Sequence, residues 1–370
     1  MRRYVFFTLQ LLCVQFAFSQ AELLKYGDFE SWITRDIKES ALMGGQTKRL
    51  YEVGPEGKFD GAKPFFNQGG SPWANSNVYA KVCGIVKTNC SVFPDKHGDG
   101  KCVKLMSRIE KCKAIGIVNI TVLAAGSIYT GTMVEPITGT SNPMSKINVG
   151  IPFTRKPKAL MMDYKVSLTN EPNRIKETGF GKRKTVPGQD MCEVVCLLQK
   201  RWEDADGNLH AKRVGTLRMR FDKSTDGWQD GKQFPIHYGD ISKESWYRDW
   251  MGPVVGERTY YALNSKGENV PISEEGFASA DETPTHLILK FDSRLLQYRN
   301  YRRCIKDIIF VYRYQFHLCY TLLRNSVHFP VKAQLSSTRT RTTIEFNLWN
   351  LSTYPFLIAK EIKLHIKLHV

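Results

Sequence analysis

The sequence predicts an all-β protein, a two-sheet β-sandwich of jelly-roll type. Short runs of β-branched and apolar residues recur between residues 21 and 293, and strands favour these residue types. Clusters of Gly, Pro, Asn and Asp separate the runs at intervals of about 8–12 residues, which is the spacing of an all-β sandwich or barrel. No convincing amphipathic helix and no repeat accompanies them. Many strands in about 270 residues suit one sandwich domain.

Three strands are expected in the first half of the chain. The run Cys102–Met106 follows the turn signal Gly98-Asp99-Gly100, and Ile115–Leu123 is rich in β-branched residues. The run Lys158–Leu168 has an apolar centre and alternating ends. Two prolines between residues 151 and 157 precede it, and proline is tolerated near the start of a strand.

The clearest local unit is a hairpin. Glu193–Trp202 forms its first strand, and Asp206-Gly207-Asn208 is a tight turn of the kind that needs positive φ. The chain returns through Leu209–Lys212 and Val214–Phe221. The acidic residues from Asp204 onward resemble a calcium loop, but the glycine is misplaced for an EF-hand. A hairpin turn is therefore predicted.

Two further strands are expected at Thr259–Leu263 and Thr285–Phe291. The best short helix candidates are Lys243–Trp250 and Ser31–Lys38. A second, small β domain in the N-terminal third is the alternative to one continuous sandwich.

The first 19 residues have the pattern of a signal peptide, with two arginines and then an apolar run to Phe18. Ala17-Phe18-Ser19 places small residues where a signal peptidase needs them, so cleavage before Gln20 is expected. Cys13 allows a lipoprotein alternative, but Leu12 stands where a small residue is needed. The apolar run is too short to span a membrane. We expect export to the periplasm, the cell surface or the medium, without a transmembrane segment.

The charge of the chain is distributed unevenly. The 370 residues carry a formal net charge of +17 and are 42% hydrophobic, which excludes a wholly disordered chain and a multi-span membrane protein. Residues 294–370 hold 13 Lys and Arg against 3 Asp and Glu. Without this tail and the leader's Arg2 and Arg3, the formal charge is +5. That is too little to argue for binding a nucleic-acid backbone, so no nucleic-acid partner is expected.

Residues 294–370 also differ in composition. They contain no glycine, although the chain has 28, and they are rich in Tyr, Arg, His and Leu. Because turns rely on Gly, Asn, Asp and Pro, the tail does not continue the preceding β pattern. We expect the reading frame or gene boundary to depart from the original near Ser293; a small basic C-terminal domain is the alternative. The predicted organisation is a signal peptide over 1–19, a β domain over 24–293 and an atypical tail over 294–370.

The cysteines indicate buried free thiols rather than a full disulfide framework. Cys192 and Cys196 stand four residues apart in an expected strand, a span of about 13 Å that no disulfide bridges. Zinc is a poor alternative, because no close Cys-x-x-Cys pair is present. Six cysteines lie between leader and tail: Cys83, Cys90, Cys102, Cys112, Cys192 and Cys196.

The opening Tyr26-Gly-Asp-Phe-Glu-Ser-Trp32 is similar to the first segment of exported sugar-binding jelly rolls. Three further segments follow in order: Asn67–Val78, Gly150–Leu160 and Asp226-Gly227-Trp228. On these segments, the stretch Leu24–Ser293 resembles the putative carbohydrate metabolism domain common in gut Bacteroidetes. The resemblance implies a β-sandwich similar to galactose-binding-like modules and a role in glycan use.

Two departures from this family pattern stand out. Tyr26 occupies the place of the usual Asn. After Phe291-Asp292-Ser293 the chain continues with Arg294-Leu295-Leu296, without the closing strand and paired acids that the family usually has. A missing closing strand would leave a sheet edge unpaired.

Sugar binding needs flat aromatic surface together with carboxylates, amides or Arg for the hydroxyl groups. Two segments, Gly69–Asn77 and Ser245–Trp250, supply this combination. The alternative is core packing, since tryptophans at i and i+4 would share one face of a short helix. Trp73 could likewise fill the interior. The predicted ligand-binding residues are Trp73, Asn75, Trp246, Arg248 and Trp250.

The expected function is that of an exported, non-catalytic protein that binds an oligosaccharide or polysaccharide or assists its use. A glycoside hydrolase is the first alternative and needs two carboxyl groups about 5–9 Å apart. The spacing of Asp240, Glu244, Asp249 and Glu257 selects no such pair. A cell-surface structural or adhesin subunit is the second alternative.

No catalytic residue is assigned, because hydrolase, metalloprotease and nucleotide-binding motifs are missing. The one cofactor weighed is a structural calcium ion, as in similar jelly rolls. Asp28 and Glu30 would contribute its oxygen ligands.

Overall fold

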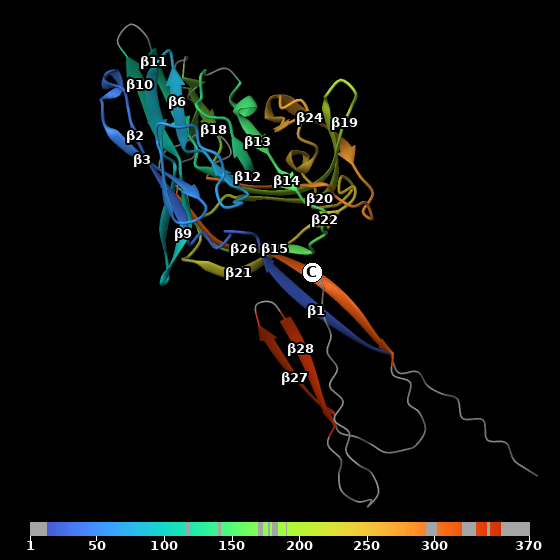
Figure 1. Cartoon of the computed structure of the whole chain (residues 1–370). Coiled ribbons are helices and arrows are strands. Elements are labelled where there is room, and N and C mark those ends of the chain that lie inside the picture. The colour runs from blue at the N-terminus through green and yellow to red at the C-terminus, as the bar shows by residue number, and fades with distance from the viewer. Residues whose placement is uncertain are drawn as a thin grey trace, which may run out of the picture. The chain divides into compact units, whose positions relative to one another are not determined.

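The computed structural model describes residues 13–114, 118–139, 142–168, 173–176, 178–179, 184–189, 191–293, 302–319, 331–338 and 341–348. The chain divides into two compact units, Ala17–Gln315 and a second made of Met1–Phe16 with Phe316–Val370. In the second unit, β27 (Val331–Thr338) and β28 (Arg341–Leu348) pair as an antiparallel hairpin. The larger unit contains the two main sheets (Figure 1).

The larger sheet has ten strands. Its main order is β13 (Ile147–Val149), β12 (Ser127–Met133), β25 (His286–Asp292), β19 (Cys192–Glu203), β20 (Leu209–Phe221), β24 (Asn269–Phe277) and β23 (Tyr261–Leu263). The centre of the sheet is the long hairpin β19–β20 with β25 beside it. Three short strands pair with this series: β14 (Ile151–Pro152) with β25, β22 (His237–Tyr238) with β20, and β5 (Trp73–Asn75) with β12.

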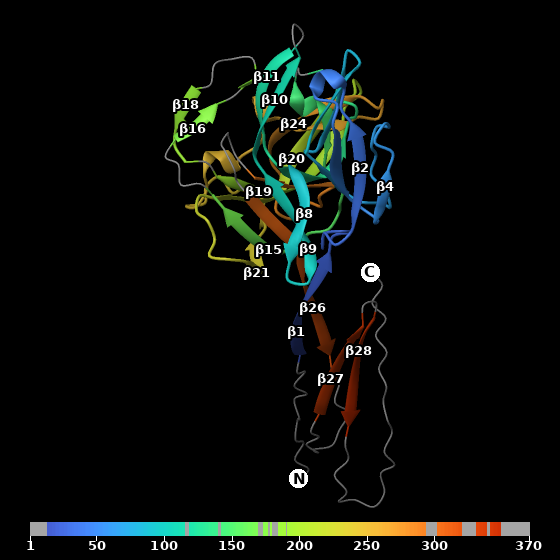
Figure 2. The ribbon, with the colours of Figure 1, turned by 90° about the vertical axis from the view of Figure 1, so that its left-hand side faces the viewer.

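The second sheet has six strands and includes segments from both ends of the larger unit (Figure 2). Its order is β21 (Gln229–Pro235), β15 (Ala159–Ser167), β26 (Arg302–Cys319), β9 (Gly100–Met106) and β8 (Val92–His97), and β1 (Cys13–Leu23) pairs with β26.

The main hydrophobic core joins side chains of both sheets, such as Leu160 of β15 with Val194 and Leu198 of β19. Side chains alternate along β19, so Val195 and Leu197 belong to a second buried cluster on its other face. This explains why the run from Val194 to Leu198 is apolar at every position: the strand is buried on both faces. The predicted all-β sandwich is confirmed.

Smaller sheets complete the larger unit. One consists of β3 (Thr47–Val53), β2 (Trp32–Lys38) and β4 (Gly57–Phe59). Another consists of β10 (Arg108–Ala114), β11 (Val118–Ala124) and β17 (Thr178–Gly179). Two further sheets have two strands each: β16 (Asn173–Lys176) pairs with β18 (Lys184–Pro187), and β6 (Val78–Val82) pairs with β7 (Ile85–Asn89). All of these strands lie in the same compact unit as the main sheets, in place of a separate N-terminal domain.

The expected strands are confirmed where the structure describes them. The hairpin is β19–β20, and its turn glycine Gly207 has φ +92°. The other expected strands correspond to β9, β15, β23 and β25, and Ile115–Leu123 corresponds to β11 from Val118 onward. Residues 115–117 lie outside the described residues.

Both helix candidates are wrong. Residues of Ser31–Lys38 form β2, in which buried and exposed side chains alternate with the period of a strand. Lys243–Trp250 is irregular until the short turn η3 begins. Among the described residues, helical structure is confined to η1 (Ala41–Met43), η2 (Pro143–Lys146), η3 (Asp249–Met251) and η4 (Gly256–Arg258).

The compact unit extends beyond the expected boundary at Ser293. Strand β26 lies between β15 and β9, and its Ile308 and Phe310 are buried in the main core. The backbone N–H of Leu24 also donates to the carbonyl of Ile308 at 3.0 Å. The first part of the basic tail therefore supplies an interior strand, and a change of reading frame remains a prediction.

The expectation of buried thiols outside disulfides is confirmed for Cys102, Cys192 and Cys196. It is wrong for burial at Cys83, which is exposed, and at Cys90, which is half-buried, although neither forms a disulfide. The side chain of Cys112 lies outside the described residues. Strand β1 crosses the expected cleavage point before Gln20, and export remains a prediction. No helix among the described residues is long and apolar enough to cross a membrane.

Candidate functional site

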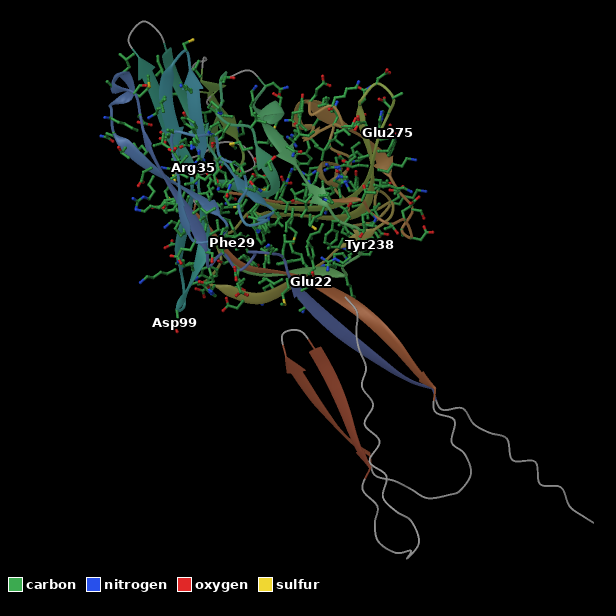
Figure 3. All side chains as sticks on the ribbon, viewed as in Figure 1. Glu22, Phe29, Arg35, Asp99, Tyr238 and Glu275 are labelled. Carbon is green, nitrogen blue, oxygen red and sulfur yellow. The ribbon has the colours of Figure 1, made fainter. Side chains whose placement is uncertain are left out.

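An arginine stands at an inward position of β2. Buried side chains alternate along this strand, so Ile33, Arg35 and Ile37 share its inward face. Arg35, labelled in Figure 3, is 0% exposed. Removing a charge from water is costly, so a buried guanidinium requires partners of opposite sign and good hydrogen bonds.

Two glutamates supply these partners. Nη1 of Arg35 donates to Oε1 of Glu52 at 2.9 Å and to Oε1 of Glu135 at 3.1 Å, while Nη2 donates to Oε2 of Glu135 at 2.6 Å. Glu52 lies on β3, beside β2, and Glu135 follows β12. Burial lowers the pKa of Arg35, but its hydrogen bonds with Glu135 and the charges of both glutamates outweigh this and raise it.

Asparagine side chains surround Glu52. Nδ2 of Asn75 donates to Oε2 of Glu52 at 2.8 Å and to the carbonyl of Tyr51 at 3.0 Å. Oδ1 of Asn75 accepts the backbone N–H of Asn77 at 2.7 Å. Asn77 then donates to the carbonyls of Tyr51 and Val92, at 2.8 and 3.0 Å. The amides therefore hold β3, β5 and β8 together around the acid.

A small pocket opens beside these groups. The space in and around it, open solvent included, is about 270 Å³, but its interior has room for about one water molecule. It is therefore far smaller than the roughly 300–1,000 Å³ of most small-molecule sites, and only a single hydroxyl group of a ligand could enter it. The lining residues are Glu52, Phe65, Asn67, Ala74, Asn75, Asn77, Met133 and Glu135.

Phenylalanines add aromatic surface next to the polar lining. Phe65 lies 5.0 Å from the guanidinium of Arg35, and its ring packs edge-on against Phe59 with centres 5.2 Å apart. Phe66 also packs edge-on against Phe59, with ring centres 5.8 Å apart, and is 66% exposed. One large apolar ring is thus presented to solvent in the same loop as the lining residues Phe65 and Asn67.

The two acids of the pocket have different environments. Burial raises the pKa of Glu52 to about 8, with a further rise from the charge of Glu135, while Arg35 and Asn75 lower it. Both described contacts of Glu52 are with donor groups. When Glu52 is protonated, its O–H needs another acceptor, and the pocket beside it has room for one. Glu135 instead accepts from Arg35 and from the backbone N–H of Phe65 at 2.9 Å.

Trp73 does not line this pocket. It is 1% exposed and packs between Phe29 and Phe291, with ring centres 5.2 and 6.5 Å away. Its indole N–H donates to the carbonyl of Lys25 at 3.0 Å. This position matches the alternative that Trp73 fills the interior, because neither face of its ring is open to a ligand. Asn75, two residues later, is the predicted residue that lines the pocket.

The other predicted residues lie elsewhere. Trp246 is 37% exposed and stacks near His237, with ring centres 4.3 Å apart. Trp250 lies 4.0 Å from the guanidinium of Arg220. Arg248 is exposed and donates to the carbonyl of its neighbour Tyr247 at 2.7 Å. No contact among the described residues joins this segment to the pocket, and its role in ligand binding remains a prediction.

The expected calcium ligands have protein partners. Oδ1 of Asp28 accepts the backbone N–H of Glu30 at 3.3 Å. Oε2 of Glu30 accepts the backbone N–H of Lys101 at 2.9 Å, and Nζ of Lys101 donates to the carbonyl of Glu30 at 3.1 Å. In the described part of the chain, no third metal-ligating side chain joins these two. Calcium at Asp28 and Glu30 remains a prediction.

None of the four acids considered for hydrolysis lines the pocket. The carboxyl pair that the fold brings together is Glu52 with Glu135, which the sequence argument did not name. One signal in the sequence points to it. Arg35 alternates with Ile33 and Ile37, so in a strand the three side chains share one buried face, and a buried arginine needs acidic partners. A helix over Ser31–Lys38 does not place these three residues on one face, so the predicted helix concealed the signal. Glu135 is 100 residues away from Arg35, and no local pattern connects them.

Comparison with known proteins gives one family and two solved structures. A family model described as "Putative carbohydrate metabolism domain" matches residues 51–240, a range that contains every residue lining the pocket. No curated protein matches the chain.

Both similar structures are described as putative glycoside hydrolases. One, from Bacteroides thetaiotaomicron, has 18% identity and a TM-score of 0.38, and the match covers 62% of this chain and 59% of that one. The other, from Bacteroides vulgatus, has 13% identity and a TM-score of 0.37 over 60% of this chain and 78% of that one. The chain thus spans about three fifths of the length of the first structure.

Proposed function

Because the chain belongs to the family of the putative carbohydrate metabolism domain, we propose that it is an exported, non-catalytic protein that binds a glycan at the mouth of the small pocket beside Arg35, here called the Arg35 pocket, with one sugar hydroxyl group reaching inside. Membership of this family gives the chain a carbohydrate-related role. Binding, export and the pocket as the site are the proposal.

The observation that carries the proposal is the combination of chemistry at the pocket. Asparagine amides and glutamate carboxyls can exchange hydrogen bonds with sugar hydroxyls, and an exposed phenylalanine can cover the apolar face of a sugar ring. Asn67 donates through Nδ2 to the carbonyls of Ser71 and Gly131, at 2.9 and 3.0 Å. Its Oδ1 has no hydrogen bond within the described residues, so it is available to a ligand hydroxyl.

The charges of the pocket favour a neutral sugar. Both terminal nitrogens of Arg35 are engaged by Glu52 and Glu135, and the described residues that line the pocket include no Lys or Arg. A uronate or sulfated sugar would place its negative charge beside Glu52 and Glu135, and no cationic side chain of the pocket would be left to pair with that charge. We therefore expect neutral glycans to bind and acidic ones to be rejected.

One observation favours hydrolysis as the second candidate function. The Oε1 atoms of Glu52 and Glu135 bond to the same nitrogen and so lie no more than 6.0 Å apart, a limit compatible with the roughly 5–5.5 Å between the carboxyl groups of retaining glycosidases. The raised pKa of Glu52 would suit the acid of such a pair. Arg35 stands against it, because it holds both carboxyl groups in a buried ion network rather than at opposite sides of a bond.

The test is binding by the purified chain to a panel of neutral and acidic polysaccharides, followed by calorimetry on the positives. Binding to neutral members supports the proposal, and absence of binding to the whole panel by a folded sample would overturn it. The same panel is assayed for new reducing ends. Release that Glu52→Gln abolishes would replace binding by hydrolysis as the function.

A further inference from the structure

A histidine and two aspartates meet at one side of the second sheet. His97 ends β8, Asp163 lies in β15 and Asp230 in β21, and one ligand atom of each lies within 4.8 Å of the others. The ring Nε2 of His97 lies 3.2 Å from Oδ1 of Asp230. The tip of the β8–β9 hairpin, next to His97, is marked by Asp99 in Figure 3. These residues are separate from those of the Arg35 pocket.

The backbone is shaped to bring the two aspartates together. The pairing of β15 with β21 is irregular at this point, so Asp163 faces both Asp230 and Gly231. Gly231 has φ +60°, a left-handed conformation typical of the glycine in a β-bulge. Its N–H donates to Oδ1 of Asp163 at 2.6 Å. Bulges redirect side chains and are frequent beside functional sites.

We propose that His97, Asp163 and Asp230 bind one divalent transition-metal ion, with its remaining positions open to water or to a ligand oxygen. An imidazole nitrogen with two carboxylates suits zinc or manganese better than calcium, which prefers oxygen ligands alone. At metal–ligand distances of about 2.0–2.2 Å, two ligands of a tetrahedral ion lie about 3.3–3.6 Å apart. The 3.2 Å between Nε2 of His97 and Oδ1 of Asp230 is already close to this, and the oxygen of Asp163, within 4.8 Å of both, would have to move closer by up to about 1.5 Å.

Trp228 holds the imidazole in place. Its ring centre lies 3.9 Å from that of His97, with the two planes inclined by 51°. It belongs to the segment Asp226-Gly227-Trp228, which lies inside the family match. Groups that fix the orientation of a ligating histidine raise metal affinity.

A second histidine in the chain provides a contrast. Nδ1 of His210 contacts Glu275 at 2.7 Å, and its Nε2 contacts Asp204 at 3.2 Å. The two ring nitrogens face different directions, so no single ion reaches both acids through one nitrogen. This arrangement raises the pKa of His210 through hydrogen bonds to Asp204 and Glu275 and so favours a proton, rather than a metal ion, on the ring.

The experiment is calorimetric titration of the EDTA-treated full chain with zinc, manganese and calcium chlorides. We expect one transition-metal ion per chain, bound at least tenfold more tightly than calcium. Asp230→Asn and His97→Ala should each weaken binding at least tenfold, while the control His210→Ala should leave it unchanged. Asp230 has a 64% exposed side chain, so its variant should keep the fold if His97→Ala does not.

Two results would overturn the proposal. One is the absence of stoichiometric binding of any of the three metal ions. The other is equal binding by Asp230→Asn and wild type, which would place the ion elsewhere. Selective broadening of the His97 ring signals by manganese in an NMR spectrum of the unmodified chain would support the site without any variant.

Discussion

Glu52 and Glu135 accept hydrogen bonds from the same nitrogen atom, Nη1 of Arg35, at 2.9 and 3.1 Å. One buried cation thus faces two carboxyl groups, and one negative charge is enough to balance it. Burial raises the pKa of Glu52 to about 8, so near neutral pH Glu52 holds a proton. The positive charge of Arg35 then needs only one carboxylate to balance it, and the first two predictions follow from this balance of charges.

Loss of the buried cation should destabilise the fold strongly. Arg35→Met leaves the Glu135 carboxylate buried without a counter-charge, and breaking a buried pair in this way costs about 3–5 kcal/mol. Arg49→Met is the matched control, since Arg49 pairs with Asp36 across the same two strands with both side chains about half exposed. Its cost should be about 0–1 kcal/mol. Urea unfolding measures both, and equal costs would contradict the argument.

The stability of the fold should fall as pH rises through the range set by Glu52. Between its ordinary value of 4.5 and about 8, the folded chain holds a proton on Glu52 that the unfolded chain has lost. The free energy of unfolding therefore decreases with rising pH, by about 1.4 kcal/mol per unit for this one group. Glu52→Gln, which cannot ionise, should show a flatter profile between pH 5 and pH 8. Parallel profiles for variant and wild type would mean that Glu52 is ionised throughout.

Phe66→Ala should weaken glycan binding without changing stability. The ring is 66% exposed, so its removal should alter the free energy of unfolding by less than about 0.5 kcal/mol. Loss of an aromatic contact worth about 0.5–1.5 kcal/mol predicts roughly two- to twelvefold weaker binding by calorimetry. Trp246→Ala is the control for a surface aromatic away from the pocket. If that variant loses binding while Phe66→Ala keeps it, the site lies at the Trp246 segment.

Phe310→Ala should test whether the basic tail belongs to the domain. The ring is 1% exposed and packs against Phe153 with centres 5.4 Å apart. Its removal should lower the free energy of unfolding by about 3–5 kcal/mol, as for other buried phenylalanines. Phe66→Ala again serves as the control, being the same substitution at the surface. An unchanged unfolding curve would show that β26 does not pack in the core.

Local chemistry made the hairpin predictable. The turn at Gly207 requires positive φ, and the strands on either side carry apolar runs that a buried central strand needs on both faces. The same reasoning located β9, β15 and β25. Each of these signals lies within a dozen residues of sequence, which is the range over which propensity and periodicity are informative.

The pocket depends on contacts that no local pattern contains. Asn75 was identified because its segment combines aromatic and amide groups, yet Trp73 in the same segment is part of the core. Arg35 lies in one sheet and Glu135 follows a strand of another, so only the packing of elements far apart in the sequence brings them together. The charge of the tail and its lack of glycine suggested that the tail lies outside the β domain. Ile308 and Phe310 are nevertheless buried in the main core, so apolar packing places strand β26 in the domain.

The position of β26 has a consequence for the order of events during synthesis. Strands β9 and β15 are made early, but the strand that lies between them begins only at Arg302. Until the ribosome has passed that point, both strands have open edges able to pair with other chains. A ribosome that stops before Arg302 would release a chain unable to complete this sheet. The domain can therefore be completed only during about the last fifth of translation. A chaperone that delays folding would protect the open edges of β9 and β15 until then.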